Sequence, residues 1–427
     1  MQSGTGARTA AARLVQGVTE LRRPMNDQLA AGAVADLAPA DRARAQRLAL
    51  STLRRLSQVD RVLAPYLRKP PPAFVRALLR VAATEMLAES APAHAVVHDA
   101  VAITRAAGRK TEGFTGMVNA VLRRVAETDP AQMAALPPQP LPGWLRGRLM
   151  AAWGKAATLA IEAAHARGAP VDLTPRDGDG AGLAARLDAR LLPTGSVRLG
   201  AGAQLSDLPG FAEGDWWVQD AAAALAARAL RPQPGERVLD LCAAPGGKTL
   251  QLAAAGAEVT ALDVSASRMA QLDENLKRCR LSARTVVADA LDWQPDRPFD
   301  AVLLDAPCSA TGTIRRHPDL PFVREADGLK DIFALQSALF NRAVGFLKPG
   351  GRLVFATCSL LPDEGERQLA AALERHPGLE SDPAAVGLAG VEPGWIGPAG
   401  GLRLRPDYWP DLGGMDGFFI AALRWRG

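Results

Sequence analysis

The chain has 427 residues, of which 48% are hydrophobic and 22% are charged, with a net charge of +5 at pH 7. This length allows two or three domains with sizeable cores, and the composition is typical of a soluble globular protein. No apolar run approaches the length of a membrane span, and the N-terminus has arginines without the apolar core of an export signal. We therefore expect a protein that neither binds a membrane nor is exported.

Basic residues are concentrated in the N-terminal part of the chain. Residues 1–150 contain 21 Lys and Arg against 11 Asp and Glu, whereas the remainder contains 29 against 34. Such a basic region indicates either a polyanionic partner or a solvated helical surface, and charge alone does not distinguish the two.

The number and spacing of the cysteines indicate the redox compartment of the protein. Cys242, Cys279, Cys308 and Cys358 are widely spaced and include no CxxC pair. This spacing predicts neither a zinc site nor a disulfide framework. We expect a reduced, cytoplasmic protein without a metal.

Residues 7 to 128 have helical periodicity throughout, without strand-like alternation. The helical spacing is clear at Leu56, Val59, Leu63 and Leu67. Pro70-Pro71-Pro72 then breaks the helix. We predict an all-α domain over residues 1–130. Its last helix contains Arg123 and Arg124, whose side chains could face RNA or water.

A proline-rich connection over residues 131–143 marks a domain boundary. Residues 144–210 are predicted to form a small α+β unit that connects the domains and could bind RNA. It has a helix near 144–164 and strand candidates at 171–173 and 196–199.

From residue 211 to 427 strand and helix patterns alternate, which predicts a doubly wound, Rossmann-like sheet with mostly parallel strands and an antiparallel last strand. The strand candidates are 238–241, 258–262, 284–288, 299–305, 351–356 and 417–425. Ligands of such sheets bind at the carboxyl ends of the strands. The residues expected at those ends are Asp240, Asp263, Asp289, Asp305 and Thr357.

The most informative run is 238–249, an apolar strand followed by a proline- and glycine-containing turn and a helix start. Gly247-Lys248-Thr249 matches the end of a phosphate-binding loop, but Cys242 stands where that loop needs its first glycine. The dinucleotide pattern G-x-G-x-x-G is absent as well. Asp263 ends the next apolar run and is placed to hold ribose hydroxyls. A ribose site without a phosphate signature suggests S-adenosylmethionine.

Cysteines follow two further strands. One strand candidate ends in the run Asp305-Ala306-Pro307-Cys308, and another ends in Thr357-Cys358. A free cysteine is often only a small core residue, but two at equivalent strand ends favour chemistry. A thiolate that adds to carbon 6 of a pyrimidine activates carbon 5 for methylation. Asp305 could then hold the base edge and stabilise the adduct, and the target base must be unstacked.

At these motifs the chain resembles the RsmB/Sun-type bacterial RNA cytosine-C5 methyltransferases over nearly its whole length. The motifs that carry the resemblance are Gln219-Asp220, 240–249, 305–309, 315–319, 348–351, 357–359 and 416–419. The N-terminal helices, with the run 118–124, resemble a NusB-like RNA-binding domain. That domain points to the members that act on small-subunit (16S) rRNA.

The resemblance implies roles for individual residues. The cofactor S-adenosylmethionine would be bound by Cys242, Ala243, Ala244, Pro245, Gly246, Gly247, Lys248, Asp263, Asp289 and Asp305. Cys358 would be the nucleophile and Cys308 would assist product release, with Lys248 and Asp305 beside them. The reverse order of the two cysteines stays open, because the Pro-Cys position is the nucleophile in DNA cytosine methyltransferases. RNA phosphates could contact Arg315, Arg316 and His317, or these residues could belong to a plain surface loop.

We therefore predict a monomeric enzyme that forms 5-methylcytidine in small-subunit rRNA. The alternatives are a tRNA cytosine-C5 methyltransferase, a DNA cytosine methyltransferase, or an RNA-binding ribosome assembly factor whose methylation is secondary. One position departs from the family pattern. Gly365 stands where the family usually has Asn, which puts in doubt the contacts of the loop after Cys358.

Overall fold

The structure is a computed structural model that describes residues 3–200 and 202–427. The chain divides into two compact units, neither of which is one continuous stretch. The helical unit comprises Met1–Met150, Thr158–Gly168 and Ile314–Glu325. The sheet unit comprises Ala151–Ala157, Ala169–Thr313 and Ala326–Gly427. Among the described helices, none has the length and apolar character needed to cross a lipid bilayer.

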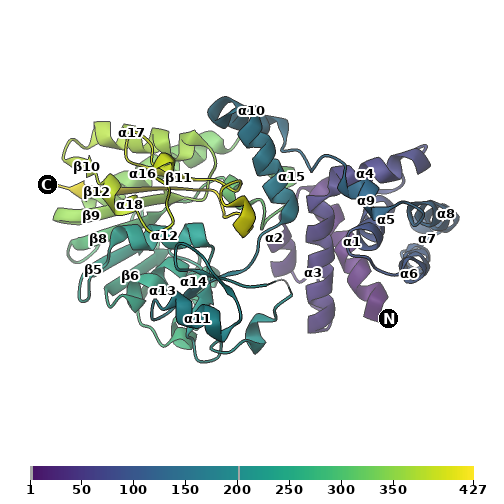
Figure 1. Cartoon of the computed structure of the whole chain (residues 1–427), viewed down its shortest axis with the longest axis horizontal. Helices are drawn as coiled ribbons and strands as arrows, with labels where there is room; N and C mark the ends of the chain where they lie inside the picture. The colour runs from purple at the N-terminus through teal and green to yellow at the C-terminus, as the bar shows by residue number, and fades with distance from the viewer. Residues whose placement is uncertain (1–2, 201) are drawn as a thin grey trace. The chain divides into compact units, whose positions relative to one another are not determined.

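The helical unit confirms the predicted all-α N-terminal domain (Figure 1). Its helices are α1 (Ser3–Leu21), α2 (Met25–Ala30), α3 (Pro39–Arg54), α4 (Leu56–Leu63), α5 (Ala73–Leu87), α6 (Ala93–Ala106), α7 (Arg109–Glu112), α8 (Thr115–Val125), α9 (Pro130–Ala134) and α15 (Leu320–Val323). Helix α5 is central, since Val75, Leu78 and Val81 are fully buried in the common core. One detail of the prediction was wrong. Leu67 is extended and lies outside α4, because Pro65 in the following 3-10 turn cannot donate the next helical hydrogen bond.

Helix α10 (Gly143–Arg167) is bent at Gly154, whose φ of +82° is not helical. After it comes a small antiparallel sheet with the strand order β2-β3-β1-β4. Its elements are β1 (Asp172–Pro175), α11 (Gly180–Arg186), β2 (Arg190–Leu191), β3 (Val197–Arg198) and β4 (Trp216–Val218). Both predicted strands are present, whereas β2 and β4 were not predicted. The fully buried side chains of Leu173, Val197 and Trp216 form its core.

The large sheet has the order β10-β12-β9-β8-β5-β6-β7, with β11 paired to β12. Its strands are β5 (Arg237–Leu241), β6 (Glu258–Asp263), β7 (Arg284–Val287), β8 (Phe299–Asp305), β9 (Leu347–Thr357), β10 (Leu379–Ser381), β11 (Leu402–Leu404) and β12 (Phe418–Trp425). Strands β5 to β9 pair in parallel, and β12 pairs antiparallel to β9. The predicted mostly parallel sheet with an antiparallel last strand is confirmed.

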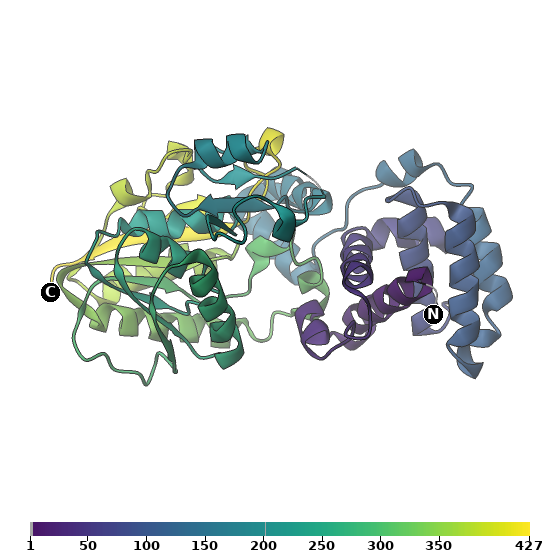
Figure 2. The same cartoon turned by 90° about the horizontal axis from the view of Figure 1, so that it is seen from below.

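Helices cover both faces of this sheet, as Figures 1 and 2 show. On one face lie α12 (Ala221–Leu230), α13 (Gly247–Ala254) and α14 (Ala266–Cys279), and on the other lie α16 (Leu329–Gly345) and α17 (Glu366–Arg375). Successive residues of a strand point to opposite faces. Leu303 therefore packs in the α12 layer, whereas its neighbour Val302 packs in the α16 layer. Burial on both faces explains why the strands are continuous apolar runs.

Candidate active site

The turn after β5 forms a tight loop at the carboxyl edge of the sheet. Cys242 begins it with a φ of +59°, and the Ala244–Pro245 peptide bond is cis. The backbone N–H of Ala244 donates to a carboxylate oxygen of Asp263 at 3.2 Å, which holds the loop against the end of β6. Gly246 has a φ of +106°, and a Cβ there would lie 2.1 Å from Leu272 Cδ1 of α14. The close approach of loop and helix therefore requires glycine at this position.

Acidic side chains gather at this edge, as the strand pattern predicted. Asp263 is buried, and its second oxygen accepts from the backbone N–H of Ser265 at 2.9 Å. Asp289 lies just after β7, is exposed, and accepts from the backbone N–H of Leu291 at 2.9 Å. Asp263 thus places a carboxylate against the loop and Asp289 places another at the neighbouring strand end, where hydroxyl and amino groups of a ligand could be bound.

Asp240 is fully buried beneath the loop. Burial raises the pKa of Asp240 to about 7, although the hydrogen bond from Thr249 and the charge of Lys248 both oppose this rise. The Thr249 hydroxyl donates to Oδ2 at 2.6 Å, whereas Oδ1 is buried with no hydrogen-bond partner. An unpaired oxygen in this position indicates a site that is completed by a ligand or a proton.

Lys248 and Asp305 form an ion pair between α13 and the end of β8, with Nζ and Oδ2 2.7 Å apart. Burial alone would lower the pKa of Lys248, but the charge and hydrogen bond of Asp305 more than offset it, so the pKa lies above its ordinary value. The ammonium group also lies 5.2 Å from the centre of the Phe418 ring. Lys248 is therefore a fixed positive charge at the sheet edge.

Cys308 and Cys358 are brought into contact, with their sulfurs 3.3 Å apart. They follow β8 and β9, which are parallel neighbours, so their strand ends meet at one edge. The N–H of Gly312 donates to the carbonyl oxygen of Cys358 at 2.9 Å and ties the two loops together. Both cysteines are partly buried rather than sealed in a core.

The thiols differ in their environments. The hydrogen bond with Cys358, together with burial, raises the pKa of Cys308 well above its usual range. Burial likewise raises the pKa of Cys242 and of Cys279. Cys308 is thus held as a neutral thiol beside Cys358, and neither Cys242 nor Cys279 has the environment of an activated thiolate.

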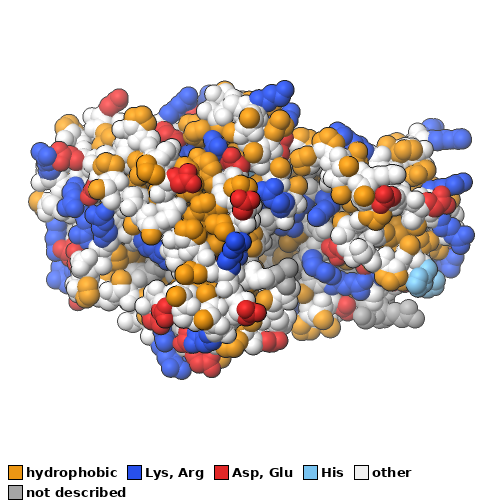
Figure 3. All heavy atoms as spheres, viewed as in Figure 1, with side chains coloured by type: hydrophobic (Ala, Val, Ile, Leu, Met, Phe, Trp, Pro, Cys, Tyr) orange, Lys and Arg blue, Asp and Glu red, His pale blue; other side chains and the backbone are white. Residues whose placement is uncertain are grey.

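The basic residues singled out in the sequence lie in the helical unit and have different exposures. Arg123 and Arg124 are exposed near the end of α8, and Arg124 pairs with Glu127 at 3.3 Å. Figure 3 shows Lys and Arg side chains on the surface of this unit, with acidic side chains among them. Arg315 is only 1% exposed, so two expectations were wrong for it: its side chain does not lie on a surface loop, and it is not accessible to RNA phosphates in this structure. Arg316 and His317 are half-buried.

Sequence reasoning assigned no role to several side chains that the structure places behind the cysteines. The main ones are Trp153, Gln336, Glu364 and Arg403. The sequence signal was weak, because Gln, Glu and Arg are common on surfaces and a single Trp is as often a packing residue. The only hint was an acidic residue, Glu364, close to the apolar pair Leu360-Leu361. Within the described residues, no group of three or more His, Cys, Asp or Glu is arranged to hold a metal ion.

This sheet order, the glycine turn after β5 and the acids at the neighbouring strand ends define a Rossmann-like methyltransferase fold. Residues 227–424 match the family described as 16S rRNA methyltransferase RsmB/F, and residues 5–127 match the NusB family. The chain belongs to the RsmB/F family of rRNA methyltransferases, with a NusB domain at its N-terminal side. The resemblance noted from the motifs is thereby confirmed.

Two curated relatives match almost the whole chain. Ribosomal RNA small subunit methyltransferase B of Xanthomonas campestris pv. campestris is 37% identical, over 99% of this chain and 97% of that protein. The protein of the same name from Pseudomonas putida is 36% identical, over 97% and 98%. Among solved structures, a methyltransferase homolog from Pyrococcus horikoshii has a TM-score of 0.55 at 27% identity and covers 67% of this chain and 100% of that one. PH0851 has a TM-score of 0.73 at 24% identity and covers 98% of both chains.

Proposed function

We propose that the protein methylates carbon 5 of a cytidine in small-subunit rRNA, with S-adenosylmethionine as methyl donor and Cys358 as a covalent nucleophile. The observation that carries the proposal is the 3.3 Å contact between the sulfurs of Cys308 and Cys358 beside the Lys248–Asp305 ion pair. Methylation of an exocyclic nitrogen needs no thiol, whereas carbon 5 of a pyrimidine is a poor nucleophile that thiolate addition at carbon 6 activates. The names of the curated relatives support small-subunit rRNA as the substrate.

The residues at the sheet edge fit the proposed cofactor. Asp263 at the end of β6 and Asp289 after β7 supply carboxylates for ribose hydroxyls, and the loop at 242–247 brings the backbone N–H of Ala244 to Asp263. The unpaired Oδ1 of Asp240 is a further acceptor under that loop. When bound, S-adenosylmethionine supplies an electrophilic methyl group.

Cys358 begins the chemistry in this proposal. Its thiolate forms a bond to carbon 6 of cytosine, and the electron pair of the C5=C6 double bond becomes available at carbon 5. Lys248, in its ion pair with Asp305, supplies a fixed positive charge at the same strand edge as the two cysteine loops. In this proposal the carboxyl group of Asp305, at the end of β8, binds the N3/N4 edge of the base.

Product release requires the reverse movement of electrons. The proton on carbon 5 passes to a base, the C5=C6 bond re-forms, and Cys358 departs with the electron pair of its C–S bond. A neutral Cys308 thiol 3.3 Å away can donate a hydrogen bond to the departing thiolate and so stabilise it. We assign Cys308 to this step.

The test compares Cys358→Ala and Cys308→Ala with the unaltered protein, using small-subunit rRNA and labelled S-adenosylmethionine. Two quantities are measured: methyl groups transferred to RNA, and protein–RNA adduct that survives denaturing electrophoresis. We expect Cys358→Ala to lose both, and Cys308→Ala to turn over slowly while accumulating adduct. An active Cys358→Ala beside an inactive Cys308→Ala would reverse the two roles. Full activity in both variants would exclude the thiolate mechanism.

A further inference from the structure

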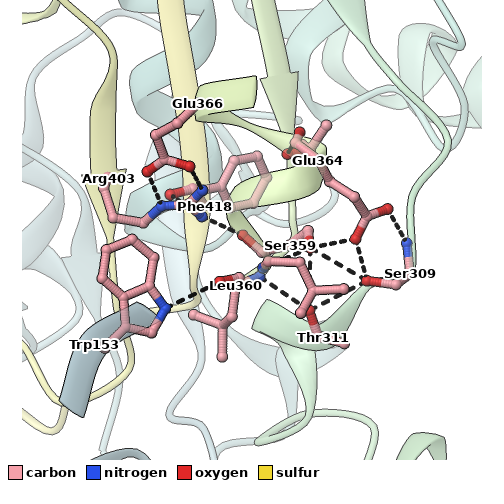
Figure 4. A network of polar contacts seen from close by, with 11 residues as sticks. Trp153, Ser309, Thr311, Ser359, Leu360, Glu364, Glu366, Arg403 and Phe418 are labelled. Carbon is pink, nitrogen blue, oxygen red and sulfur yellow. Dashed lines mark hydrogen bonds and ion pairs between the residues drawn. The ribbon is translucent and has the colours of Figure 1, made fainter. Parts of the chain in front are cut away.

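Glu364 is a fully buried carboxylate six residues beyond Cys358, in the 3-10 turn Pro362–Glu364. Figure 4 shows its side chain pointing toward Ser309, Thr311 and Ser359. Its Oε1 accepts from the backbone N–H of Ser309 at 2.8 Å and from Nε2 of Gln336 at 3.0 Å. Its Oε2 accepts from the hydroxyls of Ser309 and Ser359. Four donors therefore converge on one side chain.

These donors come from both cysteine loops. Ser309 directly follows Cys308, and Ser359 directly follows Cys358. The two hydroxyls are 3.2 Å apart, and each lies 3.2 Å from the hydroxyl of Thr311. The carboxylate of Glu364 therefore joins the residue after one cysteine to the residue after the other.

Neighbouring contacts extend this link along the same two loops. Gln336 of α16 donates to Glu364 and also to the carbonyl oxygen of Pro307, at 2.9 Å. The Thr357 hydroxyl donates to the carbonyl oxygen of Glu364 at 2.9 Å. The chain is thus held on each side of both cysteines, from 307 to 309 and from 357 to 359.

Placing a carboxyl group out of water is costly unless hydrogen bonds replace the lost solvation. Here every partner lies in the cysteine loops or in the helix behind them, and loss of the carboxylate would leave the buried N–H of Ser309 unpaired. A hydrophobic side chain could fill the same space but could not orient the two serines. The arrangement is therefore suited to fixing geometry.

A second contact holds the Cys358 loop from its other side. Arg403 of β11 donates to the carbonyl oxygen of Ser359 and forms an ion pair with Glu366 (Figure 4). Its guanidinium group lies 5.4 Å from the Trp153 ring centre, and the indole N–H of Trp153 donates to the carbonyl oxygen of Leu360 at 3.1 Å. Arg403 occupies the space beside Gly365. A Cβ added at position 365 would lie 2.5 Å from Nη2 of Arg403.

We propose that Glu364 is a positioning residue that keeps Cys308 and Cys358 in contact by joining the loops that carry them. The proposal rests on the proposed function for its catalytic meaning. The contact between the sulfurs serves thiolate release, so a shift of either loop should slow turnover. Glu364 itself does not touch the sulfurs in the contacts described above.

The first measurement reports the spacing of the sulfurs without substrate. The protein is treated with the thiol oxidant diamide, and the rate of Cys308–Cys358 disulfide formation is followed by peptide mass spectrometry. We expect the rate to fall several-fold in Glu364→Gln and further in Glu364→Ala. The matched control is Asp172→Asn, which alters an equally buried carboxylate of the sheet unit that binds Arg198 at 2.7 Å, away from the cysteines. This control should lower the melting temperature but leave the disulfide rate unchanged.

The second measurement is steady-state methylation of small-subunit rRNA. Displacement of a reacting group by about 1 Å can cost about 100-fold in rate. We expect kcat of Glu364→Gln to fall about 10- to 100-fold, with the KM for S-adenosylmethionine unchanged. If the Glu364 variants form the disulfide as fast as the unaltered protein and have the same kcat, the positioning role is overturned. If Glu364→Ala does not fold, the result for Glu364→Gln decides. Failure of Cys358→Ala to abolish adduct would instead overturn the proposed function, while the disulfide rate would still test the spacing.

Discussion

Lys248 and Asp305 lie 57 positions apart in the chain, yet their side chains form an ion pair of 2.7 Å at the edge where the two cysteine loops begin. The pair connects the start of α13 to the end of β8. Only 9% of the lysine side chain is exposed, and the aromatic ring of Phe418 lies beside it. The structure thereby holds one positive and one negative charge in fixed positions next to a pair of thiols.

Replacing Lys248 by Met should lower kcat for rRNA methylation about 100-fold, since the fixed charge that favours a thiolate is lost. Protein stability should change less than activity. The control is Lys348→Met, which removes a more exposed lysine–aspartate ion pair, with Asp300 at 2.6 Å, from the opposite end of β8. Steady-state kinetics of both variants check the prediction. Equal activities of the two variants would show that the charge at 248 has no part in the reaction.

Asp240 should make the stability of the sheet unit depend on pH. Its pKa is raised by burial from 3.8 to about 7, so between these values the folded state binds more protons than the unfolded state. The free energy of unfolding therefore falls as pH rises from about 4 to about 7, and it levels off above. Asp240→Asn should remove this fall, which amounts to at most about 1.4 kcal/mol per pH unit.

Urea unfolding of both proteins at several pH values measures the Asp240 effect. The curves should differ in slope between about pH 4 and pH 7 and run parallel above about pH 8. Parallel curves across the whole range would mean that the pKa of Asp240 is the same in the folded and unfolded protein.

Gly365→Asn, which introduces the residue usual in the family, should destabilise this protein by about 1–3 kcal/mol, as overpacking does in other cores. A Cβ at 365 would lie 2.5 Å from Nη2 of Arg403 and 2.6 Å from the ring of buried Phe419. Thermal unfolding measures the effect. Gly350→Asn is the control for the loss of a glycine. A Cβ added at position 350 would have no atom within 4 Å, although the φ of +80° at Gly350 adds some backbone strain. An unchanged midpoint for Gly365→Asn would mean that Arg403 moves aside without cost.

Arg123 and Arg124 are exposed on α8, and they could contact either RNA phosphates or water. If they contact phosphates, the double variant Arg123→Gln/Arg124→Gln should bind small-subunit rRNA more weakly at low salt. It should also reduce the slope of log K against log salt concentration by about 1 for each lost contact. Arg426→Gln, an exposed arginine at the far end of the chain, is the comparison. Identical salt slopes for the two variants would assign the α8 arginines to a solvated surface.

Much of the sheet could be predicted because buried parallel strands are continuous apolar runs that end at polar residues. All six strand candidates correspond to β5, β6, β7, β8, β9 and β12. The short strands β10 and β11 were missed, since three residues carry too little pattern. Arg315 was misjudged for a different reason. The polar run from Arg315 to Asp319 has the pattern of an exposed segment, whether free or bound to RNA, and only tertiary packing buries Arg315.

The sequence by itself determined which kinds of chemistry were available: a turn without a phosphate signature, acids at strand ends, and a cysteine after each of two strands. These features depend on neighbours in the chain, and so a local pattern reveals them. The tertiary structure alone decided that Cys308 and Cys358 touch, that Lys248 pairs with Asp305, and that Glu364 joins the two cysteine loops. Such contacts join residues about 50 positions apart. They arise from the parallel pairing of β8 with β9 and of β5 with β8, which no local pattern specifies.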